Sequence, residues 1–309
     1  MATISAVALI GFGEVGGILA RELAAAGVSD VRAFDIAFAD SQSRQSKAAL
    51  DAAVRVERTA RAALAGAELA ISAVTAGAAL DAAVSCAASL GRGTFFLDLN
   101  SVAPATKVEA AAIVDRAGGR YVEAAVMAPV PPKGLKTPIL LGGRHAPALL
   151  DAIATWPHAA RVYSDRVGAA SSVKMCRSVM IKGLEALTIE CALAASRYGV
   201  LDDVLASLSD TFPGQDWNAK ARYLISRALI HGRRRAEEMR EVAKTVEGSG
   251  YDPVMTRAIV AKQDWAADLG DVIGKARADE GDLRALLALL ESLRADDATP
   301  APKQAGARP

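Results

Sequence analysis

The run Gly11-Phe12-Gly13-Glu14-Val15-Gly16 and the later Asp35 form a pattern that can bind a dinucleotide. In a strand–turn–helix unit the first glycine permits a tight turn, the second lets the backbone approach a pyrophosphate, and the third lets the helix pack on the strand. The start of the helix offers unpaired N–H groups and the positive end of its dipole to phosphates. A carboxylate such as that of Asp35 can accept from the ribose hydroxyls and repel a 2′-phosphate, so the pattern predicts NAD rather than NADP.

The flanking sequence supports this interpretation. The apolar run Ile4–Ile10 precedes the glycines, an Ala- and Leu-rich helical pattern continues to Gly27, and a second apolar run ends at Phe34. A glycine-rich turn in an unrelated α/β protein would leave the position of Asp35 unexplained.

A second set of polar residues lies on a long helical pattern over residues 169–196. Most residues there are apolar on every side of the helix, which is typical of a buried element. At about 100° per residue, one stripe collects the polar side chains Ser171, Lys174, Arg177, Ser178, Lys182 and Glu185. A solvated edge with Lys182 and Glu185 as an i,i+3 pair would explain the stripe. We favour a wet cleft between two domains, because the helix begins just after the last predicted strand.

Lys174 is the candidate acid/base in this stripe. Hydride transfer to a carbonyl needs a proton donor, and the reverse reaction needs a proton acceptor. A lysine can serve when desolvation or neighbouring cations lower its pKa from about 10.4. Arg177, one turn away, would disfavour the protonated amine or bind an anionic substrate group, and Ser178 could orient either partner.

Alternating strands and helices fill the chain up to about residue 163. Beyond the first unit, short apolar runs predict strands at Glu68–Ala73, Thr94–Leu97, Tyr121–Val126, Ile139–Leu141 and Arg161–Tyr163, with helices from Gly77 to Leu90 and from Ala105 to Ala117 between them. This pattern is typical of a mostly parallel, doubly wound Rossmann sheet with helices on both faces. Ligands bind beyond the carboxyl ends of such strands. We therefore expect Val74, Thr75, Asn100, Ser101 and residues 126–133 to line the site.

The second half reads as all helical. After the long helix, helical periodicity recurs over residues 202–209, 218–246, 253–275 and 281–294. The sequence thus predicts a dinucleotide-binding domain over residues 1–164 and an all-α domain over 165–294, joined by the long helix. Residues 295–309 hold three prolines and no large apolar side chain, so we expect a disordered tail.

Composition excludes several other classes of protein. The net charge of +1 and 5% aromatic residues give no footprint for nucleic acid. No run approaches the roughly 18 apolar residues of a membrane span, and the start of the chain does not resemble a signal peptide. Three cysteines without CxxC spacing and three scattered histidines give no metal site. A cytoplasmic enzyme acting on a small molecule is the expectation.

Four segments together resemble the β-hydroxyacid dehydrogenase superfamily, which includes 6-phosphogluconate dehydrogenase and 3-hydroxyisobutyrate dehydrogenase. They are the glycine run at 11–16 and residues 96–104 (FLDLNSVAP), 122–129 (VEAAVMAP) and 168–175 (GAASSVKM). The resemblance implies that Lys174 is the general acid/base and that Asn100 and Ser101 lie beside nicotinamide and substrate. The C-terminal part is similar to the branch whose second domain is of unknown function. Homodimerisation through that helical domain is implied as well.

Two departures from the family pattern concern the substrate. The family's substrate loop usually reads Asp-x-Pro-Val-Ser-Gly-Gly, whereas this chain has Met127, Ala128 and Pro129 in place of the last three residues. Proline has no N–H, so much of the site for a substrate carboxylate is lost. The asparagine usually found one turn after the lysine is also missing, and Arg177 and Ser178 stand there. A bulkier or less acidic alcohol, or a carboxylate held by Arg177 or Lys133, fits equally well.

Alternatives remain for the reaction and for one histidine. Imine reductases share this architecture but typically have aspartate or tyrosine at the position of Lys174, and a non-catalytic NAD(P)-binding regulator would keep only the nucleotide site. His231 opens the charge run 231–238, in which Arg233–Glu237 and Arg234–Glu238 have i,i+4 spacing. A solvated helix face explains the run. Alternatively, this segment reaches the cleft of a neighbouring subunit, with His231 as an auxiliary proton carrier or anion ligand.

Overall fold

The computed structural model describes residues 3–52 and 54–296. Backbone contacts divide the chain into two compact units, which we call the sheet unit and the helical unit. The sheet unit comprises the residues up to Val179 together with Arg240–Pro253, and the helical unit comprises Met180–Met239 and the residues from Val254 on. The boundary expected at 164/165 marks the end of the last strand, but the division falls later because the first turns of the following helix pack with the sheet.

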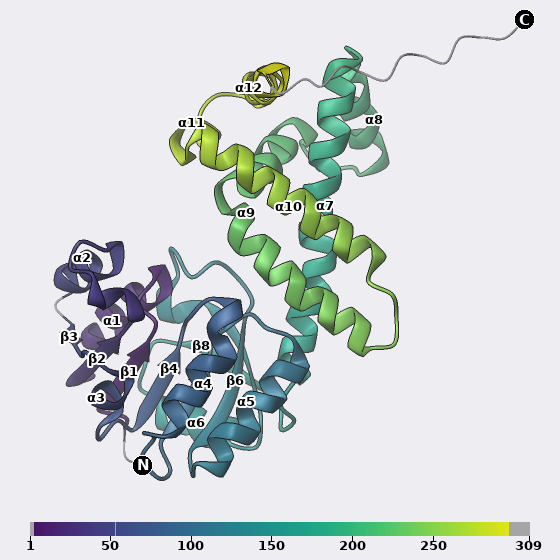
Figure 1. Cartoon of the computed structure of the whole chain (residues 1–309). Helices are drawn as coiled ribbons and strands as arrows, with labels where there is room; N and C mark the ends of the chain where they lie inside the picture. The colour runs from purple at the N-terminus through teal and green to yellow at the C-terminus, as the bar shows by residue number, and fades with distance from the viewer. Residues whose placement is uncertain (1–2, 53, 297–309) are drawn as a thin grey trace, which may run out of the picture. The chain divides into compact units, whose positions relative to one another are not determined.

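The sheet unit contains one eight-stranded sheet in the order β3-β2-β1-β4-β5-β6-β7-β8 (Figure 1). Its strands are β1 (Ala6–Ile10), β2 (Asp30–Phe34), β3 (Arg55–Val56), β4 (Leu69–Ser72), β5 (Phe95–Asp98), β6 (Arg120–Val126), β7 (Pro138–Gly142) and β8 (Ala159–Ser164). Neighbouring strands are parallel except for β6 and β7. The predicted mostly parallel, doubly wound sheet is confirmed.

Helices cover both faces of this sheet. They are α1 (Glu14–Ala25), η1 (Ile36–Ala39), α2 (Arg44–Asp51), α3 (Ala60–Leu64), η2 (Ala76–Ala78), α4 (Ala79–Ala87), α5 (Pro104–Arg116), η3 (Gly134–Lys136), α6 (Ala146–Ala152) and the first turns of α7 (Ala169–Arg197). The elements η1, α2, β3, α3, η3 and α6 were not predicted. They are short, and several are rich in alanine or polar residues, so they carry little periodic signal.

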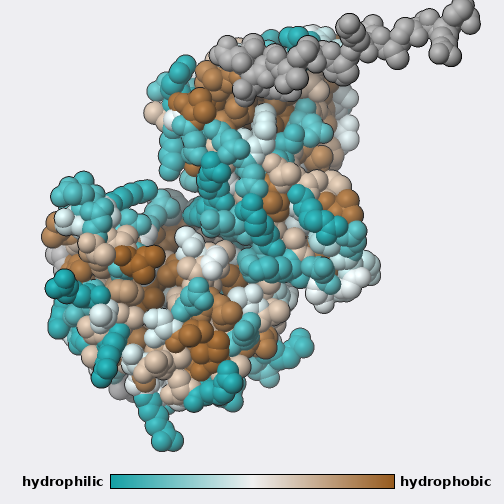
Figure 2. All heavy atoms as spheres, viewed as in Figure 1, coloured by the Kyte–Doolittle hydropathy of each residue, from teal (hydrophilic) through white to brown (hydrophobic). Residues whose placement is uncertain are grey.

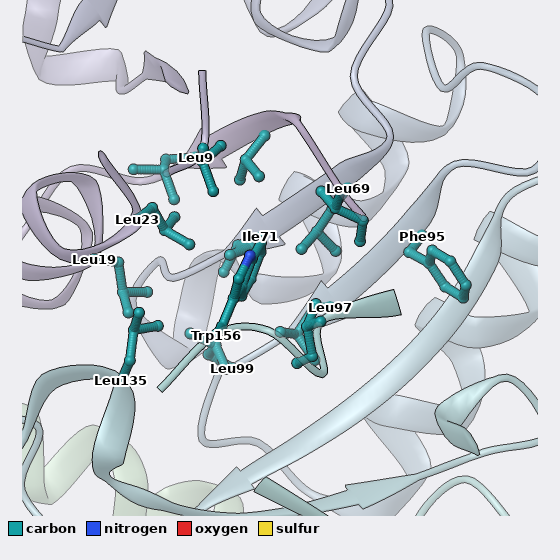
Figure 3. Close-up of a cluster of buried hydrophobic side chains, with 14 of the residues drawn as sticks. Leu9, Leu19, Leu23, Leu69, Ile71, Phe95, Leu97, Leu99, Leu135 and Trp156 are labelled. Carbon is teal, nitrogen blue, oxygen red and sulfur yellow. The ribbon is translucent and has the colours of Figure 1, made fainter. Parts of the chain in front are cut away.

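Alternate residues of the central strands build two apolar layers. Leu9, Leu69, Ile71 and Leu97 point to the face shared with α1, where Trp156 packs among them (Figure 3). Residues of opposite parity, such as Ala8 and Phe96, pack against the helices on the other face. Burial on both faces explains why these strands read as continuous apolar runs.

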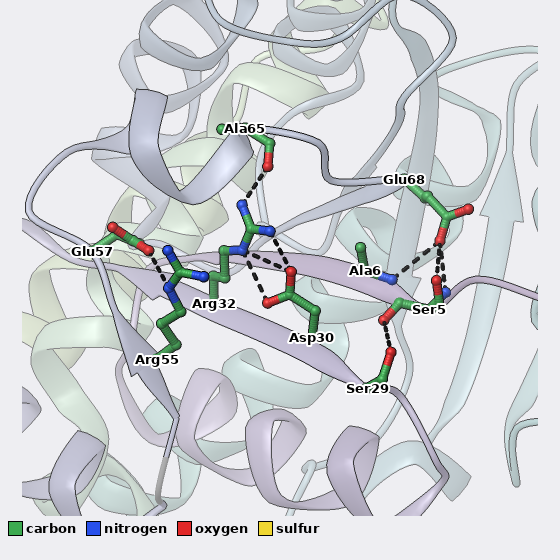
Figure 4. Close-up of polar contacts among 9 residues, drawn as sticks. All are labelled: Ser5, Ala6, Ser29, Asp30, Arg32, Arg55, Glu57, Ala65 and Glu68. Carbon is green, nitrogen blue, oxygen red and sulfur yellow. Dashed lines mark hydrogen bonds and ion pairs between the residues drawn. The ribbon is translucent and has the colours of Figure 1, made fainter.

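Polar contacts fix the amino ends of the central strands. Arg32 of β2 pairs with Asp30 and donates to the carbonyl of Ala65, and the pairing with Arg32 lowers the pKa of Asp30 (Figure 4). Glu68 accepts from the N–H groups of Ser5 at 2.7 Å and of Ala6 at 3.1 Å. These contacts are structural, and they lie at the amino ends of the strands, on the opposite edge of the sheet from the candidate site.

The outer surface of the sheet unit is partly apolar. Apolar residues gather over α4 and α5 on the face seen in Figure 2, where Val84 and Val108 are each 52% exposed. Single exposed apolar residues of this kind are ordinary on protein surfaces.

The helical unit is built from the remaining part of α7, from α8 (Leu201–Thr211), and from α9 (Trp217–Gly248) up to Met239. It also contains α10 (Val254–Ile273), α11 (Lys275–Asp279) and α12 (Leu283–Asp296) (Figure 1). The last part of α9, from Arg240 on, belongs to the sheet unit. Helices α9 and α10 approach closely at two glycines. A Cβ atom on Gly232 would lie 2.7 Å from the carbonyl oxygen of Gln263, and one on Gly270 would collide with the carbonyl oxygen of Leu229. The all-α interpretation of the second half is confirmed. Residues 295 and 296, which were expected to open a disordered tail, are instead the last residues of α12. The rest of the expected tail, residues 297–309, lies outside the described residues.

Candidate active site

The glycine turn lies between β1 and α1 and leaves little room for larger residues. Gly11 has φ +92°, and a Cβ atom there would lie 2.6 Å from the carbonyl oxygen of Ala73. A Cβ on Gly16 would collide with the carbonyl oxygen of Gly11, whereas one on Gly13 would have nothing within 4 Å. Gly11 and Gly16 therefore close the turn, and Gly13 leaves its outer side open at the start of α1. This open backbone at a helix N-terminus fits the pyrophosphate of a dinucleotide.

Asp35 lies at the same turn, just after β2. Its Oδ2 accepts from the N–H of Phe12 at 2.6 Å, and its Oδ1 accepts from the N–H of Ala37 at 2.8 Å. The sequence predicted contact with a ribose but not these two backbone contacts. A carboxylate has about four acceptor sites, so Asp35 can hold the turn and still accept from a sugar hydroxyl.

Asn100 ties together the carboxyl ends of β4 and β5. Its side-chain oxygen accepts from the N–H of Val74 at 2.8 Å, and its amide nitrogen donates to the hydroxyl of Ser72 at 2.9 Å. Asn100 is 4% exposed. Val74 and Thr75, the N-cap residue of η2, thus lie beside the Asn100–Ser101 loop, as the rule for parallel sheets led us to expect.

Lys174 reaches the same loop from α7. Its Nζ donates to the hydroxyl of Ser101, and both side chains are only partly buried. Two segments 73 residues apart in the chain thus place an amine and a hydroxyl side by side. The family resemblance implies that both residues belong to the reacting centre, and the structure brings their side chains into contact.

Glu123 fixes the start of α7, a role that the sequence analysis missed. The residue is fully buried on β6, and its carboxylate accepts from the N–H groups of Gly168, Ala170 (2.6 Å) and Ser171 (3.1 Å). A carboxylate at a helix N-terminus satisfies N–H groups that have no partner within the helix, and it interacts favourably with the dipole. An acidic residue inside the apolar strand Tyr121–Val126 was the available signal.

A second buried network, also missed, supports the Asn100–Ser101 loop. Asp98 at the end of β5 pairs with the Nζ of Lys107 at 2.9 Å, and it accepts from the hydroxyl of Tyr121 at 2.7 Å and from the N–H of Asn100 at 2.9 Å. Burial, together with the neighbouring Asp98 carboxylate, raises the pKa of Tyr121 well above its usual value, so the phenol stays a donor. The lysine in an otherwise apolar helix face was the signal for this network.

Met127 occupies an apolar environment at the predicted substrate loop. It packs, with Val173, against Ala125, Leu140 and Ala170, and its N–H is already used by the carbonyl of Pro138 at 2.9 Å. This backbone group therefore cannot serve a substrate carboxylate. Ala128 follows it, partly buried.

The remaining residues of the α7 stripe divide between the two units. In the sheet unit, Arg177 is exposed and Ser178 is buried. In the helical unit, Lys182 pairs with Glu238 at 2.7 Å, while Glu185 binds Arg235 at 2.6 Å and accepts from Gln263 at 3.0 Å. Lys182 and Glu185 are 7% and 2% exposed, so a solvated i,i+3 pair is the wrong interpretation for them.

His231 lies on α9 in the helical unit, within 2.9 Å of Arg227. Burial and the surrounding cations lower the pKa of His231 to about 4, so the ring is neutral near pH 7 and its Nε2 accepts from the guanidinium. A neutral ring of this kind is a poor proton carrier near pH 7. In the same charge run, Arg234 pairs with Glu238 as expected (3.8 Å), but Arg233 pairs with Asp268 and Asp271 of α10 instead of Glu237.

Two properties of the described residues concern other kinds of site. In the described ranges, no group of three or more His, Cys, Asp or Glu side chains is placed to hold a metal ion. No helix within the described part of the chain is both long enough and apolar enough to cross a membrane.

Comparison with known proteins relates both parts of the chain to known families. Residues 6–146 match the NAD binding domain of 6-phosphogluconate dehydrogenase, and residues 195–266 match a domain of unknown function, DUF1932. A conserved hypothetical protein from Sinorhizobium meliloti 1021 is 36% identical, with a TM-score of 0.72 over 94% of this chain and 97% of that one. A conserved protein of unknown function, described as structurally similar to 3-hydroxyacid dehydrogenases, is 31% identical, with a TM-score of 0.66 over 86% of this chain and 98% of that one.

The chain belongs to the β-hydroxyacid dehydrogenase superfamily. It represents the branch with a 6-phosphogluconate dehydrogenase-like NAD-binding domain and a DUF1932 domain. More distant solved structures share the fold. They include Mycobacterium tuberculosis 3-hydroxyisobutyrate dehydrogenase with L-serine (18% identity, TM-score 0.66, 94% and 100% covered) and an imine reductase from Streptomyces aurantiacus (19%, 0.53, 94% and 99% covered). Structures of this fold hold NADP+ in Psf3 and NAD+ in an imine reductase variant from Myxococcus stipitatus.

Proposed function

We propose that this member of the superfamily is an NAD-dependent oxidoreductase that transfers a hydride between the nicotinamide and a hydroxyl-bearing carbon, with Lys174 as general acid/base. The observation that carries the proposal is the contact between the Nζ of Lys174 and the hydroxyl of Ser101. Ser101 lies on the loop that Asn100 fixes beside Val74, at the carboxyl ends of β4 and β5. This edge is where a doubly wound sheet binds its ligands.

The chain's own residues divide the work of the proposed reaction. When bound, the nicotinamide supplies or accepts the hydride. Lys174 gives a proton to the developing alkoxide during reduction and takes it back during oxidation. Ser101 fixes the direction of the amine through its hydroxyl, and Glu123 fixes the helix that carries the amine.

The substrate end of the site favours an apolar group over a carboxylate. The N–H of Met127 is engaged with Pro138, the neighbouring Pro129 has no N–H, and Met127 packs among apolar side chains. We therefore propose an alcohol or β-hydroxy compound, or its carbonyl, with an apolar substituent near the reacting carbon. A carboxylate held by the exposed Arg177 or Lys133 is the second candidate.

Replacement of Lys174 tests the proposed function. A panel of alcohols, hydroxy acids, their carbonyls and cyclic imines is assayed through NADH absorbance with the wild type, Lys174→Ala and Lys136→Ala. Because a positioned general acid/base contributes about 10²- to 10⁴-fold, Lys174→Ala should lose that factor in kcat while the Kd for NAD stays within a few-fold. Lys136, an exposed lysine of η3, is the matched control.

Two other results of the same assay would support the alternatives. Turnover of imines alone would favour an imine reductase, a function suggested by relatives that share the fold. Full activity of Lys174→Ala would contradict the lysine mechanism, and NAD binding without turnover of any compound would favour a regulatory protein.

We further propose that the protein forms a homodimer through the helical unit and works in the cytoplasm. Light scattering during size-exclusion chromatography measures the first property. Fractionation of the cells that make the protein measures the second.

A further inference from the structure

Glu241 contacts the loop region beside the candidate active site from a distant part of the chain. It lies in the segment of α9 that belongs to the sheet unit, and its side chain is 9% exposed. One carboxylate oxygen, Oε2, accepts from the N–H of Ala103 at 2.9 Å and from the hydroxyl of Thr106 at 3.4 Å. The contact with Ala103 spans 138 residues of sequence.

These contacts cap the N-terminus of α5. Ala103 is the N-cap residue of α5 and has no polar side chain of its own. In a capping box, a glutamate three residues into the helix accepts from the N-cap N–H. Thr106 stands at that position here, and Glu241 supplies the carboxylate from another helix. Its negative charge also suits the positive end of the α5 dipole.

The capped residue is only two positions beyond Ser101. On the other side of Ser101, the side chain of Asn100 is bonded to both Val74 and Ser72. Val102 and Ala103 are 1% and 2% exposed. Ser101 is therefore held between two buried anchors, of which Glu241 provides one.

We propose that Glu241 is a positioning residue for the Ser101–Lys174 pair: it fixes the backbone after Ser101, and so the hydroxyl that receives the amine of Lys174. The inference rests on the proposed function for its kinetic consequence but not for its structural one. The length of the Glu241 side chain is what matters, because its Oε2 must come within hydrogen-bond distance of the N–H of Ala103. Its other oxygen pairs with the exposed Lys244 at 2.6 Å.

Two conservative variants separate the effect of side-chain length from that of charge. Glu241→Gln keeps the length of the side chain and an oxygen that can accept from Ala103, but it loses the charge. Glu241→Asp keeps the charge and withdraws the carboxylate by one methylene. Lys244→Gln, which alters only the exposed partner, is the matched control.

In steady-state assays, Glu241→Asp should lose about 10- to 100-fold in kcat, the range expected when a catalytic group is displaced by up to about 1 Å. Its KM for NAD should stay within about twofold, because the glycine turn is untouched. Glu241→Gln and Lys244→Gln should keep kcat within about threefold of the wild type. Full activity of Glu241→Asp, or loss in Glu241→Gln with retention in Glu241→Asp, would overturn the proposal.

A second readout does not depend on turnover. Hydrogen exchange measures how well the N–H of Ala103 is protected, and the rate of reductive methylation measures the reactivity of the Lys174 amine. Both are measured in the full-length protein. Glu241→Asp should speed exchange at Ala103 and change the methylation rate of Lys174, whereas Glu241→Gln should resemble the wild type. Unchanged rates in Glu241→Asp would refute the positioning role even if no substrate were turned over. Full activity of Lys174→Ala would refute only the lysine mechanism.

Discussion

Lys174 would have many rotamers on an isolated helix, and the acid/base role proposed for it depends on side chains that restrict them. Ser101 receives the amine, Asn100 fixes the loop that carries Ser101, and Glu123 fixes the first turn of α7. Each of the three is joined to a backbone group or side chain far away in sequence. The direction of the amine is therefore set by tertiary contacts.

Asp35 gives a prediction at this scale. Its carboxylate accepts from the N–H of Phe12 and so lies at the glycine turn, where it would repel the 2′-phosphate of NADP. Asp35→Asn should lower kcat/KM for NAD by about 10-fold, since an interaction of about 1.4 kcal/mol corresponds to that factor, and it should raise the ratio of NADP to NAD activity. The measurement is kcat/KM with each cofactor for the wild type, Asp35→Asn and the exposed control Asp40→Asn. An unchanged ratio in Asp35→Asn, or a wild type that uses NADP as well as NAD, would refute this assignment.

The elements carry these side chains to one edge of the sheet, and sequence reasoning predicted most of them. Strands β1, β2, β4, β5, β6, β7 and β8 and helix α7 were expected within a few residues of their bounds, because continuous apolar runs and long helical periodicity are strong signals. The rule that ligands bind at the carboxyl ends of parallel strands also predicted that Val74, Asn100 and Ser101 lie together, and the structure places them side by side. The antiparallel direction of β7 was not predicted, because direction depends on a connection whose path no local pattern encodes.

The supporting residues were predicted less well. Lys107, Tyr121 and Glu123 each looked like part of an ordinary helix or strand, and their partners become visible only when the elements are packed. Glu241 gave no signal at all, since an acid on a charged helix is most simply interpreted as solvated. A single sequence shows which residues can do chemistry, but long-range pairing shows what holds them in place.

The buried pair Asp98–Lys107 gives a prediction at the scale of elements, because it joins β5 to α5. Both side chains are at most 2% exposed. Lys107→Met should destabilise the protein by about 3–5 kcal/mol, since it leaves a buried carboxylate without its cation. The double variant Asp98→Asn/Lys107→Met should recover a large part of that loss.

Urea unfolding measures both free energies. The control is Arg284→Met, which removes an exposed pair with Asp202, with side chains 65% and 69% exposed; about 0–1 kcal/mol is expected there. A loss for Lys107→Met no greater than for this control would contradict the prediction.

The whole molecule combines two units with different kinds of interior. The sheet unit has two apolar layers, one on each face of its sheet. The helical unit has an apolar core but also buries Glu185, Arg235 and Gln263 side by side. Desolvation raises the pKa of Glu185, and it lowers the pKa of Arg235. Charges buried in this way make the stability of the helical unit dependent on pH.

His231 gives the last prediction, which concerns stability against acid. Its pKa is about 4 in the folded protein and about 6.5 in an unfolded chain. Between these values the unfolded state binds more protons at His231 than the folded state does. The contribution of His231 to the free energy of unfolding therefore rises with pH, and it is lost as the pH falls from about 6.5 towards 4. Glu185 has the opposite sign, because its raised pKa makes the folded state bind more protons above its ordinary range. His231→Gln removes the first contribution, keeps an acceptor for Arg227 and leaves Glu185 in place. Urea unfolding of both proteins at pH 5, 6, 7 and 8 should therefore show a smaller loss of stability on acidification in His231→Gln. Equal losses in the two proteins would show that His231 titrates in the folded protein much as it does in the unfolded chain.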